Sequence, residues 1–258
     1  ALVLEVISGK DNNDATSSSR KVDKYSKFEI RKKRKIAVIS ECLERNDVDE
    51  EVKKSIKQTI DNLQKEGHEL ENISFPLLDF LVPTYYVLTT AEASSNLARY
   101  DGIHFGYRTQ DPKSLEQTYV LSRSEGFGEE VKRRIMLGTF VLSAGYKEAY
   151  YKKAQQVRRI VENKTQEILQ KFDFILSPTT PHTAFDIGDK QSDPTKRYLE
   201  DIFTVHANIT GNPAISLPLY THTNGMPFGL QLLSKKFSER SLLSFSHELM
   251  QEHRKRWD

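Results

Sequence analysis

The feature that most constrains the fold is an alternation of strand and helix patterns between residues 36 and 76. The β-branched run IAVIS, residues 36–40, has the composition of a buried strand. Residues 48–66 then carry Val52, Ile56, Ile60 and Leu63 at helical spacing, and Gly67 ends the pattern. HELENISFP, residues 68–76, returns to a strand pattern. The segment therefore predicts a βαβ unit and an α/β fold class.

Composition narrows the class of protein. The 258 residues, 37% of them hydrophobic, suffice for a sizeable core and match the length of one domain. The 38 basic and 36 acidic residues are too balanced for a dedicated nucleic-acid-binding protein. The single cysteine, Cys42, excludes an internal disulfide and the thiolate clusters of most zinc sites. We expect a reducing compartment, the cytoplasm or an organelle matrix, and no metal site.

The first residues, ALVLEVISGK, lack an initiating Met and a basic leader. Their apolar run is far shorter than the roughly 20 residues that span a membrane, so we expect no membrane association. Residues 1–7 predict the end of a helix closed by Gly9. From these features we expect the chain to be the later part of a longer protein.

Two adjacent serines, Ser94 and Ser95, invite the interpretation of a nucleophile. They fall, however, inside a helix predicted to begin at Pro83 and to end before Gly102. A nucleophilic serine needs an exposed turn with oxyanion donors beside it, whereas the amides within a helix are already bonded. We therefore interpret the serines as small residues that let a neighbouring segment approach closely.

Opposite charges occur at the edges of two predicted apolar helix faces. Arg134 borders one face of a helix over residues 126–145, and Asp201 shares a polar stripe with Thr204 and Asn208 on a helix over 196–210. The positive charge of Arg134 could be balanced by an internal salt bridge or by a bound anionic ligand. A guanidinium that binds an α-carboxylate and a carboxylate that binds an ammonium would together suit an amino acid. The apolar face beside Arg134 consists of Val131, Ile135, Gly138, Val141 and Leu142.

Other candidates have a functional and a structural interpretation. Thr179 and Thr180 follow a predicted strand, FDFILS, in the segment PTTP, where they could line a site or form a rigid turn. His206 could act as a base, but a lone histidine is more often packed or exposed. The basic run RKKRK, residues 31–35, could bind phosphate or form a solvated flank.

Six segments, in order and at matching spacing, resemble the C-terminal half of the A subunits of glutamyl-tRNA(Gln) amidotransferases, a family of amidase-signature enzymes. The resemblance covers nearly all of residues 1–258, which we therefore expect to be the C-terminal part of a single amidase-signature domain. The segments are PTYYVLTTAEASSNLARYDGIHFGYR, RSEGFGEEVKRRIMLGTFVLSAGY, AYYKKAQQVRRI, DFILSPTTPHTAFDIG, YLEDIFTVHANITGNPAISLPL and GMPFGLQLL.

The resemblance implies a mixed β-sheet covered by helices and a glutaminase with a Ser, cis-Ser, Lys triad. Ammonia would pass to the B subunit of the amidotransferase, which uses ATP and Mg²⁺ and carries most of the tRNA contact, while the small C subunit supports the assembly. No cofactor is implied for the part of the enzyme that this chain resembles. The residues of the family that recognise glutamine match Tyr85, Arg134 and Asp201 of this sequence.

The sequence departs from the pattern of the family in one respect that concerns activity. The Gly/Ser-rich signature with both catalytic serines and the upstream lysine do not occur in this sequence, so no catalytic residue is assigned and we expect the chain alone to be inactive. Two alternatives remain: a part of another amidase-signature hydrolase, or a non-catalytic module that contacts tRNA through RKKRK and KKAQQVRR.

Overall fold

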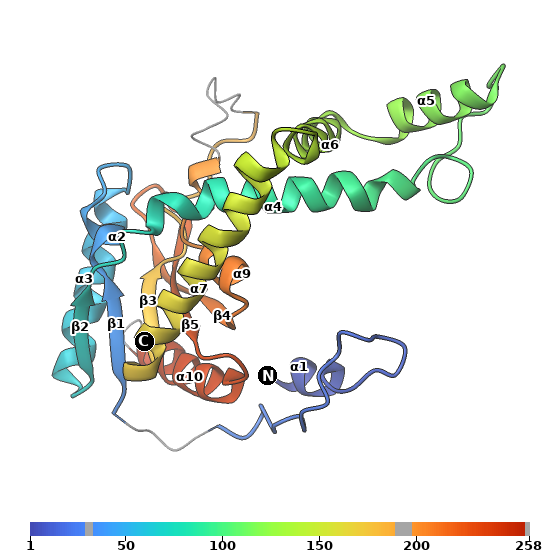
Figure 1. Cartoon of the computed structure of the whole chain (residues 1–258). Coiled ribbons are helices and arrows are strands. Elements are labelled where there is room, and N and C mark those ends of the chain that lie inside the picture. The colour runs from blue at the N-terminus through green and yellow to red at the C-terminus, as the bar shows by residue number, and fades with distance from the viewer. Residues whose placement is uncertain (29–32, 189–197, 256–258) are drawn as a thin grey trace. The chain divides into compact units, whose positions relative to one another are not determined.

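The computed structural model describes residues 1–28, 33–188 and 198–255 (Figure 1). The chain divides into two compact units, one formed by residues 1–79 and 161–258 and the other by residues 80–160. The assignment of residues 1–258 to part of a single domain stays a prediction.

The first unit is built on a five-stranded sheet with the order β2-β1-β3-β5-β4. Its first three members in chain order, β1 (Lys35–Ile39), β2 (Glu69–Ile73) and β3 (Phe174–Pro178), are parallel. β5 (Pro227–Ser234) runs antiparallel to both β3 and β4 (Ala214–Thr221). The sheet is therefore mixed, and the α/β fold class is confirmed.

The helix between β1 and β2 forms as its pattern predicts. α3 (Glu50–Lys65) begins after Asp49, whose carboxylate accepts hydrogen bonds from the amides of Glu51 and Val52. Val52, Ile56 and Leu63 are buried along one side of the helix. A parallel crossover of this kind places the carboxyl ends of β1 and β2 at the same edge of the sheet.

The first unit also contains two short helices near the N-terminus and a long helix at the C-terminus. α10 (Glu239–Lys255) has apolar residues at helical spacing, Leu242, Phe245 and Leu249, and buries all three. The ring of Phe245 stacks on Phe174 of β3 at 5.0 Å between centroids. α1 (Leu2–Ile7) and α2 (Ser40–Glu44) are each about one turn or slightly longer. α7 (Lys153–Lys171) begins in the second unit and continues into the first.

The helix predicted over residues 196–210 is interrupted. Residues 196 and 197 lie outside the described residues, residues 198 and 199 are helical, residues 200–204 form turns, and α9 (Val205–Thr210) is helical. Within these turns Ile202 and Phe203 are both buried, and the Phe203 carbonyl accepts a hydrogen bond from the Gln231 side chain at 3.0 Å. Tertiary contacts of this kind, which no local pattern in the sequence predicts, hold the turn.

The second unit is helical. α4 (Leu81–Asn96) is followed by a 3₁₀ turn (Leu97–Arg99), α5 (Leu115–Gly126), α6 (Glu129–Leu142) and a π-helical segment (Lys147–Lys152) that leads into α7. The Ser94 hydroxyl of α4 lies 3.0 Å from that of Thr139 in α6. A Cβ on Gly138 of α6 would stand 2.6 Å from the Ser94 Cβ. The interpretation of Ser94 as a helix-packing residue is therefore confirmed, while Ser95 is exposed.

Candidate functional site

Arg134 forms a cluster with two tyrosines inside the second unit. Its guanidinium carbon lies 5.7 Å from the ring centroid of Tyr86, a cation–π arrangement. Tyr86 packs edge-on against Tyr85 at 5.4 Å between centroids. Because the tyrosines belong to α4 and Arg134 to α6, the close approach of these helices at Gly138 is what assembles the cluster.

Glu130 engages one side of the guanidinium. Its Oε1 accepts a hydrogen bond from Arg134 Nε at 3.0 Å, and this bond is the main reason why the pKa of Arg134 is raised above its usual value. The internal salt bridge is therefore present. No hydrogen bond joins the two Nη groups to any residue in the described part of the chain, which leaves them available to a carboxylate.

Tyr86 and Glu130 are members of this cluster that the sequence reasoning did not select. Glu130 lies four residues before Arg134, one helical turn away, so the spacing alone could have indicated the pair. Tyr86 adjoins Tyr85, and only the register between α4 and α6 decides which ring faces the guanidinium.

Asp201 belongs to the first unit and lies in the turn before α9. Its side chain is exposed, and its carbonyl accepts hydrogen bonds from the Thr204 hydroxyl and the Val205 amide, both at 3.0 Å. The structure thus brings Tyr85 and Arg134 into one cluster and places Asp201 in the other unit. The role of all three in substrate binding stays a prediction.

The threonines that follow β3 have structural partners. Thr179 shares a 2.7 Å hydrogen bond with the Ser216 hydroxyl, and its amide donates to the Gly229 carbonyl at 3.0 Å. The Thr180 hydroxyl donates to the His182 carbonyl at 2.7 Å. Both hydroxyls therefore hold the turn in place at the carboxyl edge of the parallel strands.

A pocket of about 360 Å³ lies beside this turn. One wall is formed by His182 and Glu200, whose Nδ1 and Oε1 atoms form a hydrogen bond at 2.9 Å. Another is Asp47, whose carboxylate accepts two hydrogen bonds from Arg45 at 2.8 and 2.7 Å, so the pKa of Asp47 lies below its usual value. The remaining lining residues are Pro181, Thr183, Phe185 and Leu199.

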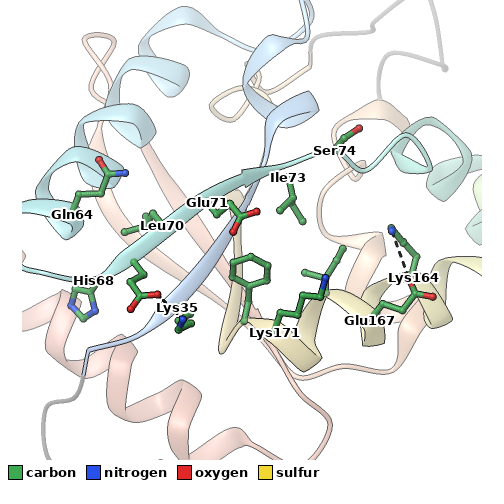
Figure 2. A pocket seen from close by; sticks show the side chains of 13 residues that line it. Lys35, Gln64, His68, Leu70, Glu71, Ile73, Ser74, Lys164, Glu167 and Lys171 are labelled. Atoms are coloured by element: carbon green, nitrogen blue, oxygen red, sulfur yellow. Dashed lines mark hydrogen bonds and ion pairs between the residues drawn. The ribbon is translucent and has the colours of Figure 1, made fainter.

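A larger hollow, of about 800 Å³, lies between β2 and α7 (Figure 2). Its walls carry charges of both signs, and each wall contains an ion pair: Lys35 of β1 with Glu69 of β2 at 2.7 Å, and Lys164 with Glu167 within α7 at 3.5 Å. The hydroxyl of Ser74, at its rim, donates to Glu41 at 2.7 Å. The hydroxyl of this serine is thus engaged by a carboxylate, and no hydrogen bond joins it to a lysine among the residues that the structure describes.

His206 is a packed residue. It is 4% exposed, its Nε2 lies 2.7 Å from the Thr165 hydroxyl, and its ring lies 4.9 Å from that of Phe75. Burial lowers the pKa of His206 to about 4. The ring therefore stays neutral near pH 7 and has no access to a substrate.

Residues 31 and 32 of the basic run lie outside the described residues. Two of its other members are engaged: Lys35 pairs with Glu69 at 2.7 Å, and Arg34 is buried with its guanidinium 5.7 Å from the Phe174 ring centroid. The burial of Arg34 does not fit a solvated flank, and the engagement of both cations gives no support to a phosphate site.

The described residues contain neither a metal-binding cluster nor a membrane-spanning helix. Across residues 1–28, 33–188 and 198–255, no three or more His, Cys, Asp and Glu side chains are grouped so that they could hold a metal ion. None of the helices in these ranges has the length and apolar character needed to cross a bilayer.

Curated relatives match the chain along nearly all of its length. The A subunit of glutamyl-tRNA(Gln) amidotransferase from Koribacter versatilis is 48% identical over 250 residues, 96% of this chain and 52% of the relative. The protein of the same name from Staphylococcus epidermidis is 46% identical over 250 residues, 96% of this chain and 51% of the relative. The chain thus spans about half the length of the curated relatives it matches.

Solved structures match this chain over a similar extent. The crystal structure of the A subunit of glutamyl-tRNA(Gln) amidotransferase from Thermotoga maritima matches with a TM-score of 0.70 and 39% identity, over 95% of this chain and 48% of that one. A 6-aminohexanoate cyclic dimer hydrolase matches with a TM-score of 0.72 at 18% identity, over 97% of this chain and 52% of that one, which supports the fold alone. The family model described as Amidase matches residues 1–243. On this evidence the chain belongs to the amidase family.

Proposed function

We propose that the full-length protein is the glutamine-hydrolysing component of a glutamyl-tRNA(Gln) amidotransferase. The observation that carries the proposal is the 46–48% identity to A subunits of this enzyme along 96% of the chain. Ammonia released from glutamine would serve the conversion of Glu-tRNA(Gln) to Gln-tRNA(Gln). The B and C subunits would complete a heterotrimer in the cytoplasm or an organelle matrix, and the B subunit would use ATP and Mg²⁺ and bind most of the tRNA.

Within this proposal the present chain supplies recognition of the substrate. The open Nη edge of Arg134 would bind the α-carboxylate of glutamine through two parallel hydrogen bonds. Tyr86, stacked on the guanidinium, limits its movement, and Tyr85 stands next to it. Asp201 would accept the α-ammonium group. Glu130 already holds Arg134 Nε, so the guanidinium meets the ligand in a fixed orientation at lower entropic cost.

Chemistry at the amide would come from outside this chain. The resemblance assigns the nucleophilic serine, the cis-serine and the lysine base to a signature segment that this sequence does not contain. We therefore expect the chain alone to release no ammonia from glutamine. Ammonia production by the purified chain, above that of a heat-denatured sample, would contradict this part of the proposal.

The experiment that tests the function uses the full-length protein with two substrates. Arg134→Ala is expected to raise KM for glutamine at least tenfold, because a charge-assisted bidentate contact is lost. Hydrolysis of a neutral amide without an α-carboxylate should be unchanged. Equal losses on both substrates would indicate a structural role for Arg134, and an enzyme that hydrolyses only the neutral amide would be another kind of amidase.

A further inference from the structure

Ser94 of α4 makes two contacts with α6. A Cβ on Gly138 would stand 2.6 Å from the Ser94 Cβ, so the two helices are in close contact at this point. The Ser94 hydroxyl also lies 3.0 Å from that of Thr139. Because Thr139 donates its own proton to the carbonyl of Ile135 at 2.8 Å, it accepts the proton of Ser94. Ser94 therefore joins the helices by packing and by a directional hydrogen bond.

The Arg134 cluster lies one helical turn from these contacts. Arg134 precedes Gly138 by four residues in α6. Tyr86 precedes Thr90, whose carbonyl lies against Gly138, by four residues in α4. Four residues of a helix rise about 6 Å and return to the same face. Since both helices are continuous over this turn, a shift between them at Gly138 would be carried to Arg134 and Tyr86.

The stacking of Arg134 on Tyr86 tolerates little movement. The guanidinium carbon lies 5.7 Å from the ring centroid, and the cation–π attraction is confined to about 6 Å. Glu130 belongs to the same helix as Arg134, so its 3.0 Å hydrogen bond fixes the guanidinium relative to α6 and not relative to α4. The distance from the guanidinium to the ring therefore also depends on the register between the helices, to which the Ser94 hydrogen bond contributes.

We propose that Ser94 is a positioning residue: its hydrogen bond to α6 sets the register of the two helices and so holds Arg134 against Tyr86. The inference rests on the proposed function, because it gives Arg134 the role of binding the α-carboxylate of glutamine. Every contact in it lies within the second unit. Ser94 itself would not touch the substrate. Its loss would weaken the binding of glutamine in the ground state and the transition state alike, which raises KM and leaves kcat unchanged.

The test uses the full-length protein with two substrates, glutamine and a neutral amide that has no α-carboxylate. Ser94→Ala retains the Cβ that packs on Gly138 and removes the hydroxyl. KM for glutamine is expected to rise about threefold, as the loss of one partly exposed hydrogen bond allows, while kcat and hydrolysis of the neutral amide stay unchanged. Ser95→Ala, the same substitution at the adjacent exposed position of α4, is the matched control and should leave KM unchanged.

Variants of Thr139 test the hydrogen bond from its other side. Thr139→Val retains the shape of the side chain and removes the acceptor, so it should match Ser94→Ala. Thr139→Ser retains the hydroxyl and should behave like the parent protein. The double variant Ser94→Ala/Thr139→Val should be no worse than either single variant, because both remove the same contact.

A further comparison tests whether Ser94 acts through Arg134. In the Arg134→Ala background, Ser94→Ala should raise KM for glutamine no further, because the guanidinium that it positions is gone. A merely structural role would add to the effect of Arg134→Ala and would also impair hydrolysis of the neutral amide. Either of these results would overturn the inference.

Failure of the inference and failure of the function give different results. If Arg134→Ala raises KM for glutamine and Ser94→Ala does not, the inference is overturned and the proposed function stands. If Arg134→Ala leaves KM unchanged, Arg134 does not bind the α-carboxylate, and the inference falls together with that part of the proposed function. A fall in kcat with unchanged KM in Ser94→Ala also overturns the inference.

Discussion

A side chain on Gly138 would occupy space that Ser94 already fills, since its Cβ would stand 2.6 Å from the Ser94 Cβ and closer still to the carbonyl oxygen of Thr90. The backbone of α6 therefore packs directly against α4 at this point. The same approach sets the register that places Arg134 over the ring of Tyr86. Packing at Gly138 and the geometry of the candidate site are thus coupled.

Gly138→Ala is accordingly predicted to destabilise the protein. In an unobstructed helix this change would be stabilising by about 0.5–1 kcal/mol, but overpacking against Thr90 and Ser94 costs about 1–3 kcal/mol. We expect a lower midpoint of urea unfolding. Met136→Ala, on the exposed side of the same helix, should change the free energy of unfolding by less than about 0.5 kcal/mol. A stabilised Gly138→Ala variant would show that the helices separate easily.

The periodic elements of the fold were predictable from the sequence, because their buried residues recur at the spacing of one face. Val52, Ile56, Leu63 and Phe245 are all buried as their patterns predict. α5 (Leu115–Gly126) was not predicted, because its buried residues are not apolar. Its buried residues are Thr118 and Ser122, whereas Leu115 and Val120 are 63% and 56% exposed.

The candidate site was predictable only in part. Arg134 was found because a charge at the border of an apolar face is visible in one helix alone. Its stacking on Tyr86 depends on the register between two helices, which no local pattern contains. The turn at Asp201 was mistaken for part of a helix because it is held by tertiary contacts, such as the hydrogen bond from the Gln231 side chain to the Phe203 carbonyl, which override helical propensity.

Arg134 and Arg133 offer a matched pair of substitutions. Both guanidinium groups bind Glu130, but only that of Arg134 lies over an aromatic ring. Arg134→Lys retains the positive charge and loses the planar fork, so KM for glutamine in the full-length protein should rise about tenfold. Arg133→Lys should leave KM unchanged. An unchanged KM in Arg134→Lys would mean that the positive charge beside Glu130, rather than the planar fork, governs binding.

The start of α3 gives a prediction about stability alone. Asp49 accepts the amides of Glu51 and Val52 at 2.8 and 3.2 Å, so Asp49→Ala should cost about 1 kcal/mol of unfolding free energy. Asp49→Ser, which retains a capping oxygen, should recover most of that loss. Asp61→Ala, at an exposed position within the same helix, is the control and should have little effect. The urea unfolding midpoint should therefore be lowest for Asp49→Ala, higher for Asp49→Ser and close to that of the parent protein for Asp61→Ala.

His206 should make the protein less stable in mild acid. The Thr165 hydroxyl donates to the Val161 carbonyl and so accepts from His206 Nε2, which fits a neutral ring. Burial lowers the pKa of His206 to about 4, against roughly 6.5 in the unfolded chain. The unfolded chain therefore takes up the proton first as the pH falls. The contribution of His206 is complete above about pH 6.5 and is lost progressively toward pH 4, by up to about 3 kcal/mol.

Urea unfolding of the parent protein and of His206→Gln, measured at pH values from 7.5 to 4.5, checks this linkage. Gln cannot take up a proton in this range, so the variant should lose less stability than the parent as the pH falls, even if it is less stable at pH 7.5. His247→Gln removes an exposed histidine and should retain the slope of the parent. Parallel curves for the parent and His206→Gln would mean that the buried imidazole is not the group responsible, because a linked proton must alter the pH dependence when its site is removed.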